Sequence, residues 1–261
     1  MDLEFSARTD VGRVRANNED AVHVDAARRL MVLADGMGGY NAGEVASAMA
    51  IECITTELGQ WLDAARADTP VGGVQRAIER CIEMANRAIF EAANTRPDCA
   101  GMGTTVVLAL VWGRQLLLAH VGDSRAYRWQ RGALTQLTRD HSLLQEQLDA
   151  GLITPLEAAQ SGYRSLITRA LGVEDTVLVD HQVLDLQGGE TFLLCSDGLT
   201  EMVPDLEIAG VLGAGGSLDE QASTLIDLAN LSGGRDNVSV ILMHLKEMAK
   251  MSGFVSRLLK K

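Results

Sequence analysis

Hydrophobic residues recur along the chain with two different periods. In residues 72–94 the apolar side chains are spaced mostly by three and four positions, at Val74, Ile78, Cys81, Ile82, Ala85 and Ile89. This spacing predicts an amphipathic helix with one buried stripe. Further helices are expected over residues 43–66 and over residues 218–231.

Short apolar runs bounded by turn residues predict strands elsewhere in the chain. Residues 21–34 read as two short strands with a turn near residues 25–28. Residues 104–138 are expected to form an antiparallel meander, because Gly113 and Gly132 mark tight turns within it. A polar, helix-prone stretch interrupts the pattern over residues 141–165. Strands then resume in three places, at residues 176–186, 190–198 and 237–245.

The order of these elements indicates the fold class. The strands are joined as hairpins and the helices are grouped, which argues against a doubly wound parallel sheet. We therefore expect an α+β fold in which helices cover antiparallel sheets, built as a single domain over residues 1–246. Residues 247–261 are basic with apolar residues between the charges, so this tail can lie on a membrane surface or dock on a partner. A solvated terminus is the alternative.

Composition narrows the classes of function. The chain has 261 residues, of which 47% are hydrophobic and 22% charged, as in ordinary soluble proteins. It contains no apolar run of about 18 residues and no secretory signal pattern, so a cytoplasmic protein without a membrane span is expected. A net charge of −12 opposes binding to nucleic acid. The four cysteines form no C-x-x-C pair, which disfavours a zinc site.

Acidic residues follow or flank several of the predicted strands. A single Asp-Gly after a strand is usually only a turn. Here the pattern repeats at Asp35, Asp123 and Asp197, and acidic residues also occupy polar turns beside strands at Glu19, Asp20 and Asp236. If the sheets bring these positions together, the carboxylates repel one another unless cations are bound. Carboxylates with a free backbone carbonyl are ligands for Mg²⁺ or Mn²⁺, and two such ions can activate a shared water for attack on a phosphoester.

Two arginines precede the first acidic pair. Arg13 and Arg15 would point to the same face if this segment were a strand. A guanidinium group matches the oxygens of a phosphate, so either arginine is a candidate for substrate binding. The alternative is that both are ordinary surface residues.

Taken together, these segments resemble the ordered motifs of the bacterial PPM-type (protein phosphatase type 2C) serine/threonine phosphatases. The resemblance extends from about Arg8 to Leu245, nearly the whole chain. It rests on seven segments in order: "DVGRVRANNEDA", "VLADGMGGYNAGEVAS", "GMGTTVVLAL", "LAHVGDSRAY", "LITRALG", "LLCSDGLTEMV" and "GGRDNVSVI". Each segment alone is a weak signal, but their joint order is specific.

The resemblance implies a fold and a set of site residues. The fold would be a central antiparallel β-sandwich flanked by helical hairpins, a four-layer α-β-β-α arrangement, with residues 141–165 as a helical flap beside the site. Two catalytic Mn²⁺ or Mg²⁺ ions would be held by carboxylates and one carbonyl, from Asp20, Asp35, Asp197, Asp236 and Gly36. A third ion would bind Asp123 and share Asp197. Glu19 would orient water, and Arg15 would bind the substrate phosphate, with Arg13 a weaker candidate.

The resemblance also implies an activity. Such an enzyme hydrolyses phosphoserine and phosphothreonine in proteins by direct attack of a water that bridges the two ions. It would oppose a bacterial Ser/Thr kinase, and we expect a monomer. One alternative is a catalytically weak relative that senses or docks phosphoproteins, which would be expected to lack some of the ligands. Another is a different metal-dependent phosphohydrolase such as a nuclease, which the acidic charge disfavours.

Two positions depart from patterns seen in relatives. Many eukaryotic members have a histidine, proposed as the general acid, where this chain has Met37, and a thioether has no proton to donate. Tyr40 replaces a histidine that is frequent in bacterial members. Of the remaining histidines, only His141, at the start of the expected flap, is a candidate for proton transfer. The other four, His23, His120, His181 and His244, lie in strand patterns that favour structural roles.

Overall fold

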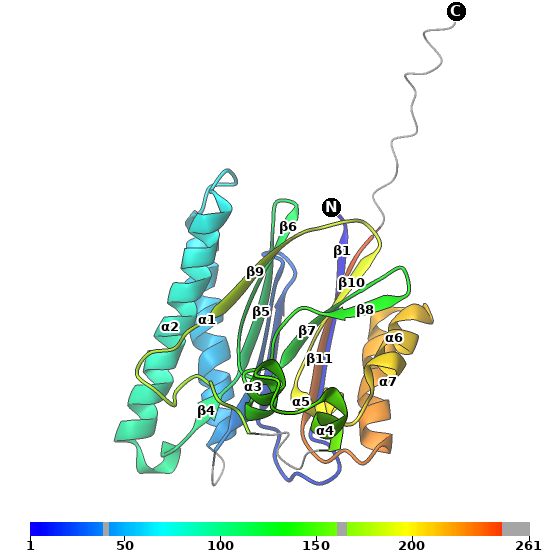
Figure 1. Cartoon of the computed structure of the whole chain (residues 1–261). Helices are drawn as coiled ribbons and strands as arrows, with labels where there is room; N and C mark the ends of the chain where they lie inside the picture. Colours follow the sequence, from blue (N-terminus) through cyan, green and yellow to red (C-terminus); the bar gives the residue numbers. More distant parts are fainter. Residues whose placement is uncertain (39–41, 161–165, 247–261) are drawn as a thin grey trace, which may run out of the picture.

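The computed structural model describes residues 1–38, 42–160 and 166–246 (Figure 1). Three sequence-based expectations therefore lie wholly or partly outside the described residues. They concern Tyr40, the last part of the flap at 161–165, and the basic tail at 247–261. Within the described residues, no helix is both long and apolar enough to cross a membrane.

Two antiparallel sheets form the centre of the molecule. The first has the order β1 (Leu3–Asp10), β11 (Val238–Leu245), β10 (Glu190–Cys195), β7 (Arg125–Gln130) and β8 (Ala133–Gln136). The second has the order β2 (Asp20–Asp25), β3 (Leu30–Met37), β5 (Val106–Trp112), β6 (Gln115–Val121) and β9 (Asp180–Asp185), with β4 (Gly103–Thr104) paired to the end of β3.

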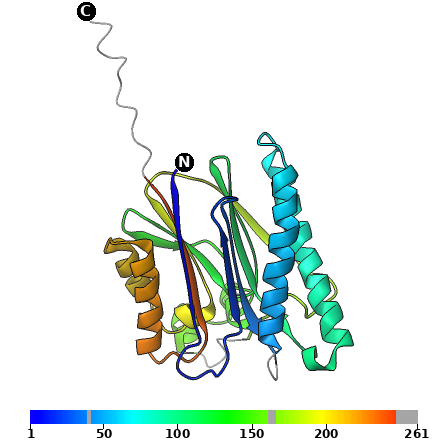
Figure 2. The same ribbon diagram turned by 180° about the vertical axis from the view of Figure 1, so that it is seen from behind.

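Helices cover the outer face of each sheet, as Figures 1 and 2 show from opposite sides. The second sheet carries α1 (Gly43–Ala64) and α2 (Val71–Thr95), followed by a short 3₁₀ turn at Pro97–Cys99. The first sheet carries α5 (Asp197–Thr200), α6 (Asp205–Gly213) and α7 (Leu218–Leu231). The structure thus has the four-layer α-β-β-α arrangement that the sequence predicted.

Both faces of β3 are buried, and its side chains alternate between two apolar layers. Leu30, Val32 and Ala34 pack against the helical layer, whereas Met31 and Leu33 pack between the sheets. Successive side chains of a strand point to opposite faces, so a strand covered on both sides must be apolar at every position. The uninterrupted apolar run before Asp35 is the sequence signature of this central location.

Several element boundaries agree closely with the sequence pattern. α1, α2 and α7 occupy almost the predicted ranges, and α7 begins with a full capping box between Ser217 and Glu220. Four elements were not predicted: strand β1, an edge strand with much of its surface exposed, the short helices α5 and α6, and the 3₁₀ turn at Pro97–Cys99. In β1 the apolar residues Leu3, Phe5 and Ala7 alternate with polar ones, a strand signal that sequence reasoning missed, whereas the short helices carry no long run with a single period.

The expected meander over residues 104–138 is divided between the sheets. β5 and β6 pair in the second sheet, whereas β7 and β8 pair in the first. The chain crosses at Gly122, which has a φ of 108°, and a Cβ there would lie 2.6 Å from Cβ of Thr105. A tight turn that only glycine can adopt thus replaces a hairpin. The crossing leaves Asp123 at one end of the sandwich.

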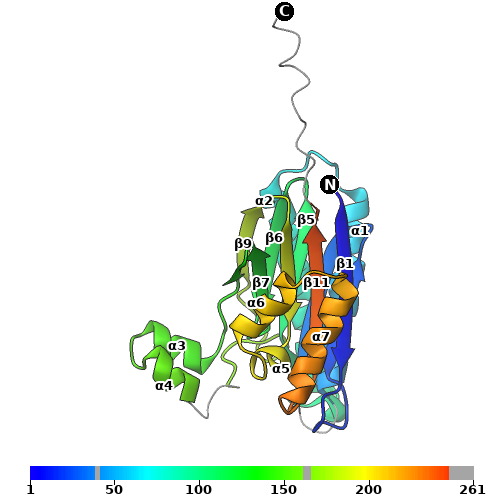
Figure 3. The ribbon, with the colours of Figure 1, turned by 90° about the vertical axis from the view of Figure 1, so that its right-hand side faces the viewer.

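The flap projects from that same end. Its described part contains α3 (Leu143–Asp149) and α4 (Pro155–Gln160), which stand away from the sandwich in the edge-on view (Figure 3). The two ends of the insert are joined by an antiparallel bridge between Ser142 and Ile167 and by a hydrogen bond from Leu143 N–H to the carbonyl of Leu166 (2.9 Å). The flap is therefore anchored at its base by backbone pairing.

Candidate metal centre

The first two predicted ligands face each other in the second sheet. Asp20, the first residue of β2, is directly opposite Asp35 on β3. Like charges in opposite positions of an antiparallel pair are destabilising. Asp20 is also only 9% exposed, and its Oδ1 atom is buried without a hydrogen-bond partner. A bound cation or a proton would therefore relieve the repulsion between these two carboxylates.

Two more aspartates reach the same place from the first sheet. Asp197 begins α5 directly after β10, and Asp236 precedes β11. The Ser196 hydroxyl donates a hydrogen bond to Oδ2 of Asp20 (2.8 Å), which joins the two sheets beside the acidic residues. The turns that carry Asp197 and Asp236 are in close contact, because a Cβ on Gly198 would lie 1.9 Å from the carbonyl oxygen of Asn237.

Electrostatics show that all five aspartates converge. Burial raises the pKa of Asp35 well above its ordinary value, and the charges of Asp20, Asp197, Asp123 and Asp236 raise it further. Burial likewise raises the pKa of Asp197, with additional contributions from Asp123 and Glu201. Asp20 and Asp123 are buried and the other three aspartates are partly exposed, so carboxylates this close together repel one another unless cations are bound.

The donor set fits hard divalent cations. It consists of carboxylate oxygens, it includes the orphaned Oδ1 of Asp20, and it contains no cysteine or histidine. Such oxygen-only sets suit Mn²⁺ and Mg²⁺ rather than zinc. The residues present are therefore compatible with the ions that the sequence predicted.

The backbone around Asp35 is held rigidly. Its N–H donates to Oγ1 of Thr105 (3.0 Å), and its carbonyl accepts from Thr105 N–H (2.8 Å) and from the Thr104 hydroxyl (2.9 Å). The next residue must be glycine, because a Cβ on Gly36 would lie 2.1 Å from the carbonyl oxygen of Gly43. These contacts leave only the Asp35 carboxylate free to face the cluster.

Glu19 lies beside the cluster against the first turn of α1. A Cβ on Gly43 would lie 2.8 Å from the carboxyl carbon of Glu19, which places this carboxylate at the positive end of the helix. Burial nevertheless raises the pKa of Glu19, although Arg15 opposes the shift. The Glu19 carboxyl group is thus a better proton acceptor than an exposed glutamate.

Sequence reasoning missed the residue that organises this loop. The side chain of Asn237 accepts from Glu19 N–H (2.8 Å) and donates to the carbonyls of Val11 (2.9 Å) and Asn17 (2.8 Å). It therefore ties the segment before β2 to the turn before β11. Its place after Asp236 was a possible signal, but the partners are more than two hundred positions away.

The two arginines are placed differently from each other. Residues 11–19 form turns rather than a strand, so the expectation that Arg13 and Arg15 share a strand face is wrong. Arg15 reaches the cluster, where its Nη2 lies 2.6 Å from Oδ2 of Asp236 and half of its side chain is exposed. Arg13 is exposed and is held through its N–H by the carbonyl of Gly234 (2.7 Å).

Asp123 lies at the flap side of the cluster. It is 7% exposed, and burial raises its pKa to about 6, with a further contribution from Asp140. Together with Asp197 and Glu201 it borders a cavity of about 270 Å³. Asp140 is neutralised by Arg125 (Nη2 to Oδ2, 2.6 Å), so that carboxylate is not available for a cation.

His141 is not positioned as an acid. Its Nδ1 accepts from Gly122 N–H (3.0 Å), and its Nε2 faces Oδ2 of Asp180 (3.4 Å). Burial lowers the pKa of His141 to about 4, so the ring is neutral near pH 7. Both ring nitrogens are engaged within the protein. The remaining histidines all lie in strands, as the sequence indicated.

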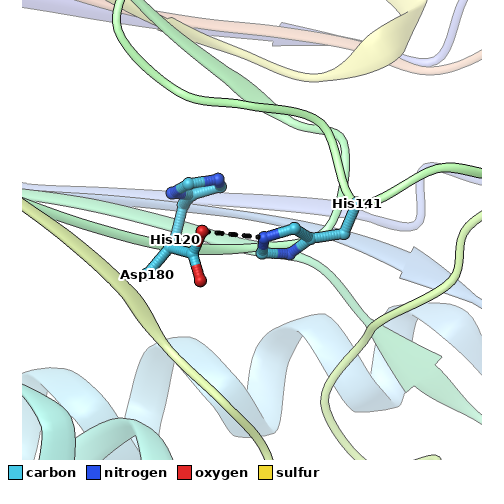
Figure 4. Close-up of side chains that lie close together, drawn as sticks. All are labelled: His120, His141 and Asp180. Carbon is cyan, nitrogen blue, oxygen red and sulfur yellow. Dashed lines mark ion pairs between the residues drawn. The ribbon is translucent and has the colours of Figure 1, made fainter. Parts of the chain in front are cut away.

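His141 also belongs to a second group of possible ligands, with His120 and Asp180 (Figure 4), whose nearest ligand atoms lie within 4.8 Å of one another. The two imidazole rings are stacked, with an interplanar angle of 15° and a centroid distance of 4.8 Å. Since ring lone pairs lie in the ring plane, near-parallel stacked rings do not aim at one ion. Arg169 already supplies the positive charge, with Nη1 2.9 Å from Oδ1 of Asp180. We interpret this group as a structural network.

The chain is similar to known proteins over most of its length. The family model of protein phosphatase 2C matches residues 12–225. The chain belongs to the protein phosphatase 2C family. The serine/threonine phosphatase stp of Listeria welshimeri is 40% identical over 253 residues, which cover 96% of this chain and 98% of that protein. PstP of Mycobacterium tuberculosis is 42% identical over 243 residues, 92% of this chain and 44% of that longer protein.

Solved structures of this family agree with the architecture. The crystal structure of PstP from Mycobacterium tuberculosis superposes with a TM-score of 0.85 at 41% identity, covering 94% of this chain and 99% of that one. The PstP catalytic domain in complex with two manganese ions gives a TM-score of 0.80 at 40% identity, covering 94% and 99%. The predicted family and fold are therefore confirmed.

Proposed function

We propose that this chain is a Mn²⁺- or Mg²⁺-dependent protein serine/threonine phosphatase that removes phosphate from phosphoserine and phosphothreonine. The observation that carries this proposal is the convergence of five buried or partly buried aspartates from both sheets at one end of the sandwich. The serine/threonine phosphatase stp of Listeria welshimeri matches along 98% of its length, and one related structure contains two manganese ions.

The residues of the cluster would share the ions as follows. Two would be held by the carboxylates of Asp20, Asp35, Asp197 and Asp236 with the carbonyl of Gly36, and a third by Asp123 and Asp197. When bound, such ions lower the pKa of a shared water and neutralise the oxygens of the phosphoryl group. The opposed pair of Asp20 and Asp35 and the orphaned Oδ1 atom support this arrangement.

The surrounding side chains would hold the substrate and move protons. Arg15 is half exposed beside Asp236, so its guanidinium group can bind a phosphate that arrives from solvent. Glu19, with its raised pKa, would orient the attacking water and accept its proton. Met37 has no proton to donate and His141 is engaged on both nitrogens, so the leaving alkoxide would take its proton from water in the site.

Turnover of p-nitrophenyl phosphate and of a phosphothreonine peptide, with and without Mn²⁺, tests the function. We expect hydrolysis that depends on Mn²⁺. Asp35→Asn and Asp197→Asn should each lower kcat by at least about a thousandfold while circular dichroism remains unchanged. Asp227→Asn, on the exposed face of α7, is the matched control. Near-normal rates in both active-site variants would overturn the assignment of the ligands.

We also infer the setting of this activity. Residues 1–246 would form one catalytic domain, monomeric and cytoplasmic, that opposes a Ser/Thr kinase. Two observations support the domain assignment. The four layers pack against one another without a break, and the match to the catalytic domain of PstP covers 94% of this chain and 99% of that one. The alternative of a catalytically weak phosphoprotein-sensing relative is not favoured, because every predicted acidic ligand is present and the five aspartates lie together.

A further inference from the structure

A groove opens next to the candidate metal centre, on the side where β3 ends. Its volume is about 360 Å³. The walls are formed by the end of β3 and by the segment that follows the flap, with apolar side chains from Met37, Ile167, Val173, Val177 and Leu178. Because Met37 follows Gly36 directly, the groove begins one residue from a carbonyl that we assign to the metal centre.

The apolar lining is unusually exposed. Leu178 is 66% exposed and Val173 is 56% exposed. Among the described residues, half of the large hydrophobic side chains that face solvent belong to the flap and the segment after it, namely Leu152, Leu156, Leu166, Val173 and Leu178. Of these five, Val173 and Leu178 line the groove, and exposed apolar side chains beside a site indicate a surface that another molecule covers in use.

Hydrogen bonds hold the groove in a preformed shape. Arg169 donates to the carbonyl of Leu178 (3.1 Å) and to Asp180 (2.9 Å), and both bonds fix the far wall. On the other side, the buried Asn86 of α2 accepts from Gly172 N–H (2.8 Å) and donates to the carbonyl of Glu174 (3.0 Å). A ligand would therefore lose little energy in ordering these walls.

Charge favours an uncharged occupant. The groove is lined by one basic residue, Arg169, which is paired with Asp180, and by one acidic residue, Glu174. The near wall is the thioether of Met37, whose methyl group meets Val173 above Gly103: a Cβ on Gly103 would lie 2.9 Å from Met37 Cε and 3.2 Å from Val173 Cγ2. On a chain with a net charge of −12, the lining is locally neutral: six of its ten residues are apolar, and Thr168 and Thr176 are its uncharged polar residues.

We propose that this groove binds an apolar side chain of the phosphoprotein substrate, about two to four positions from the phosphorylated residue. The inference rests on the proposed function, which requires a polypeptide to pass beside the metal centre. An extended chain advances about 3.3 Å per residue, and the groove begins at Met37, the residue after Gly36, so side chains near the phosphorylated residue would be the ones to enter it. Met37 then has a role as an apolar wall for substrate recognition.

A set of phosphothreonine peptides tests this proposal. One leucine is moved through positions −4 to +4 of an otherwise Ala/Ser background, and kcat/KM is compared with that of the leucine-free peptide. We expect about a fivefold to tenfold advantage at one or two positions, chiefly in KM, since burial of a leucine in an open groove recovers part of its transfer free energy. The double variant Val173→Ser/Leu178→Ser should abolish this ratio, whereas Leu206→Ser, an exposed leucine on α6, should keep it.

A change of specificity provides a second measurement. Leu178→Asp should replace the preference for leucine with a preference for lysine or arginine at the same peptide position. The proposal is overturned if wild-type enzyme favours leucine at no position, or if the preference persists in both groove variants. Hydrolysis of p-nitrophenyl phosphate separates the two inferences, because a protein with no Mn²⁺-dependent turnover of this small substrate refutes the proposed function itself.

Discussion

The buried carboxylates should make the metal-free protein less stable than a variant that lacks one of them. Asp20→Asn is the informative change, because Asp20 faces Asp35 and its Oδ1 atom has no partner. An asparagine can still accept the hydrogen bond from Ser196. Its amide group can also donate toward the carboxylate of Asp35. The substitution thus removes one charge from the cluster and keeps the packing.

The magnitude follows from the pKa of Asp20. Burial, and then the charge of Asp236, raises this pKa from 3.8 to about 6. At about 1.36 kcal/mol per unit, the ionised form costs about 3 kcal/mol. Because the folded-state pKa is raised, the contribution of the neutral carboxyl is fully present below pH 3.8 and is lost as pH rises through 6. Metal-free wild-type protein at pH 7.5 therefore carries the whole penalty.

Thermal unfolding in EDTA measures this effect. We expect Asp20→Asn to be more stable than wild type by about 1–3 kcal/mol at pH 7.5, which raises Tm by about 2–12 °C for a domain of this size. The difference should vanish at pH 4. Saturating Mn²⁺ should reverse the order, because the wild type binds the ions more tightly.

The control for this experiment is Asp227→Asn on the exposed face of α7, which should change stability by no more than about 0.5 kcal/mol. A variant at position 20 that is equal to or less stable than wild type in EDTA at pH 7.5 would refute the reasoning. That result would mean that the carboxylates do not repel one another in the metal-free protein.

Two further predictions concern single side chains of the site. Arg15→Ala should raise KM for phosphopeptides by about tenfold or more and leave Mn²⁺ affinity within a few-fold, because we propose that the guanidinium group binds phosphate rather than metal; an unchanged KM would remove this role. Asp123→Asn should abolish the weakest Mn²⁺ site in a calorimetric titration and preserve the two others; loss of all three sites, or of none, would contradict the assignment.

Local patterns in the sequence were sufficient for the elements that have a long, single period. The stripe along residues 72–94 corresponds to α2, and the apolar run before Asp35 corresponds to a strand covered on both faces. Burial of a face fixes the spacing of the apolar residues along an element. This spacing can therefore be recognised without knowing which other elements pack against that face. The ordered motifs added the family, which the comparisons confirm.

Local patterns failed where the decision depends on distant partners. The loop over residues 11–19 is shaped by Asn237 and Gly234 rather than by its own propensity, so the strand expected around Arg15 does not form. The crossing at Gly122 needs the second sheet, and a hairpin reading of residues 104–138 could not anticipate it. The roles assigned to individual ligands stay predictions until the proposed variants are measured.

The sequence by itself therefore determined the family, the candidate site residues and the pattern of most elements. Only the tertiary structure decided that Asp20 lies opposite Asp35, that His141 is engaged on both nitrogens, and that Met37 borders a groove formed with the segment after the flap. The physical reason is the separation along the chain of the residues that interact. Periodicity records burial along a single element, whereas charge repulsion, hydrogen-bond satisfaction and cavity shape arise between residues that only the packing of two sheets brings together.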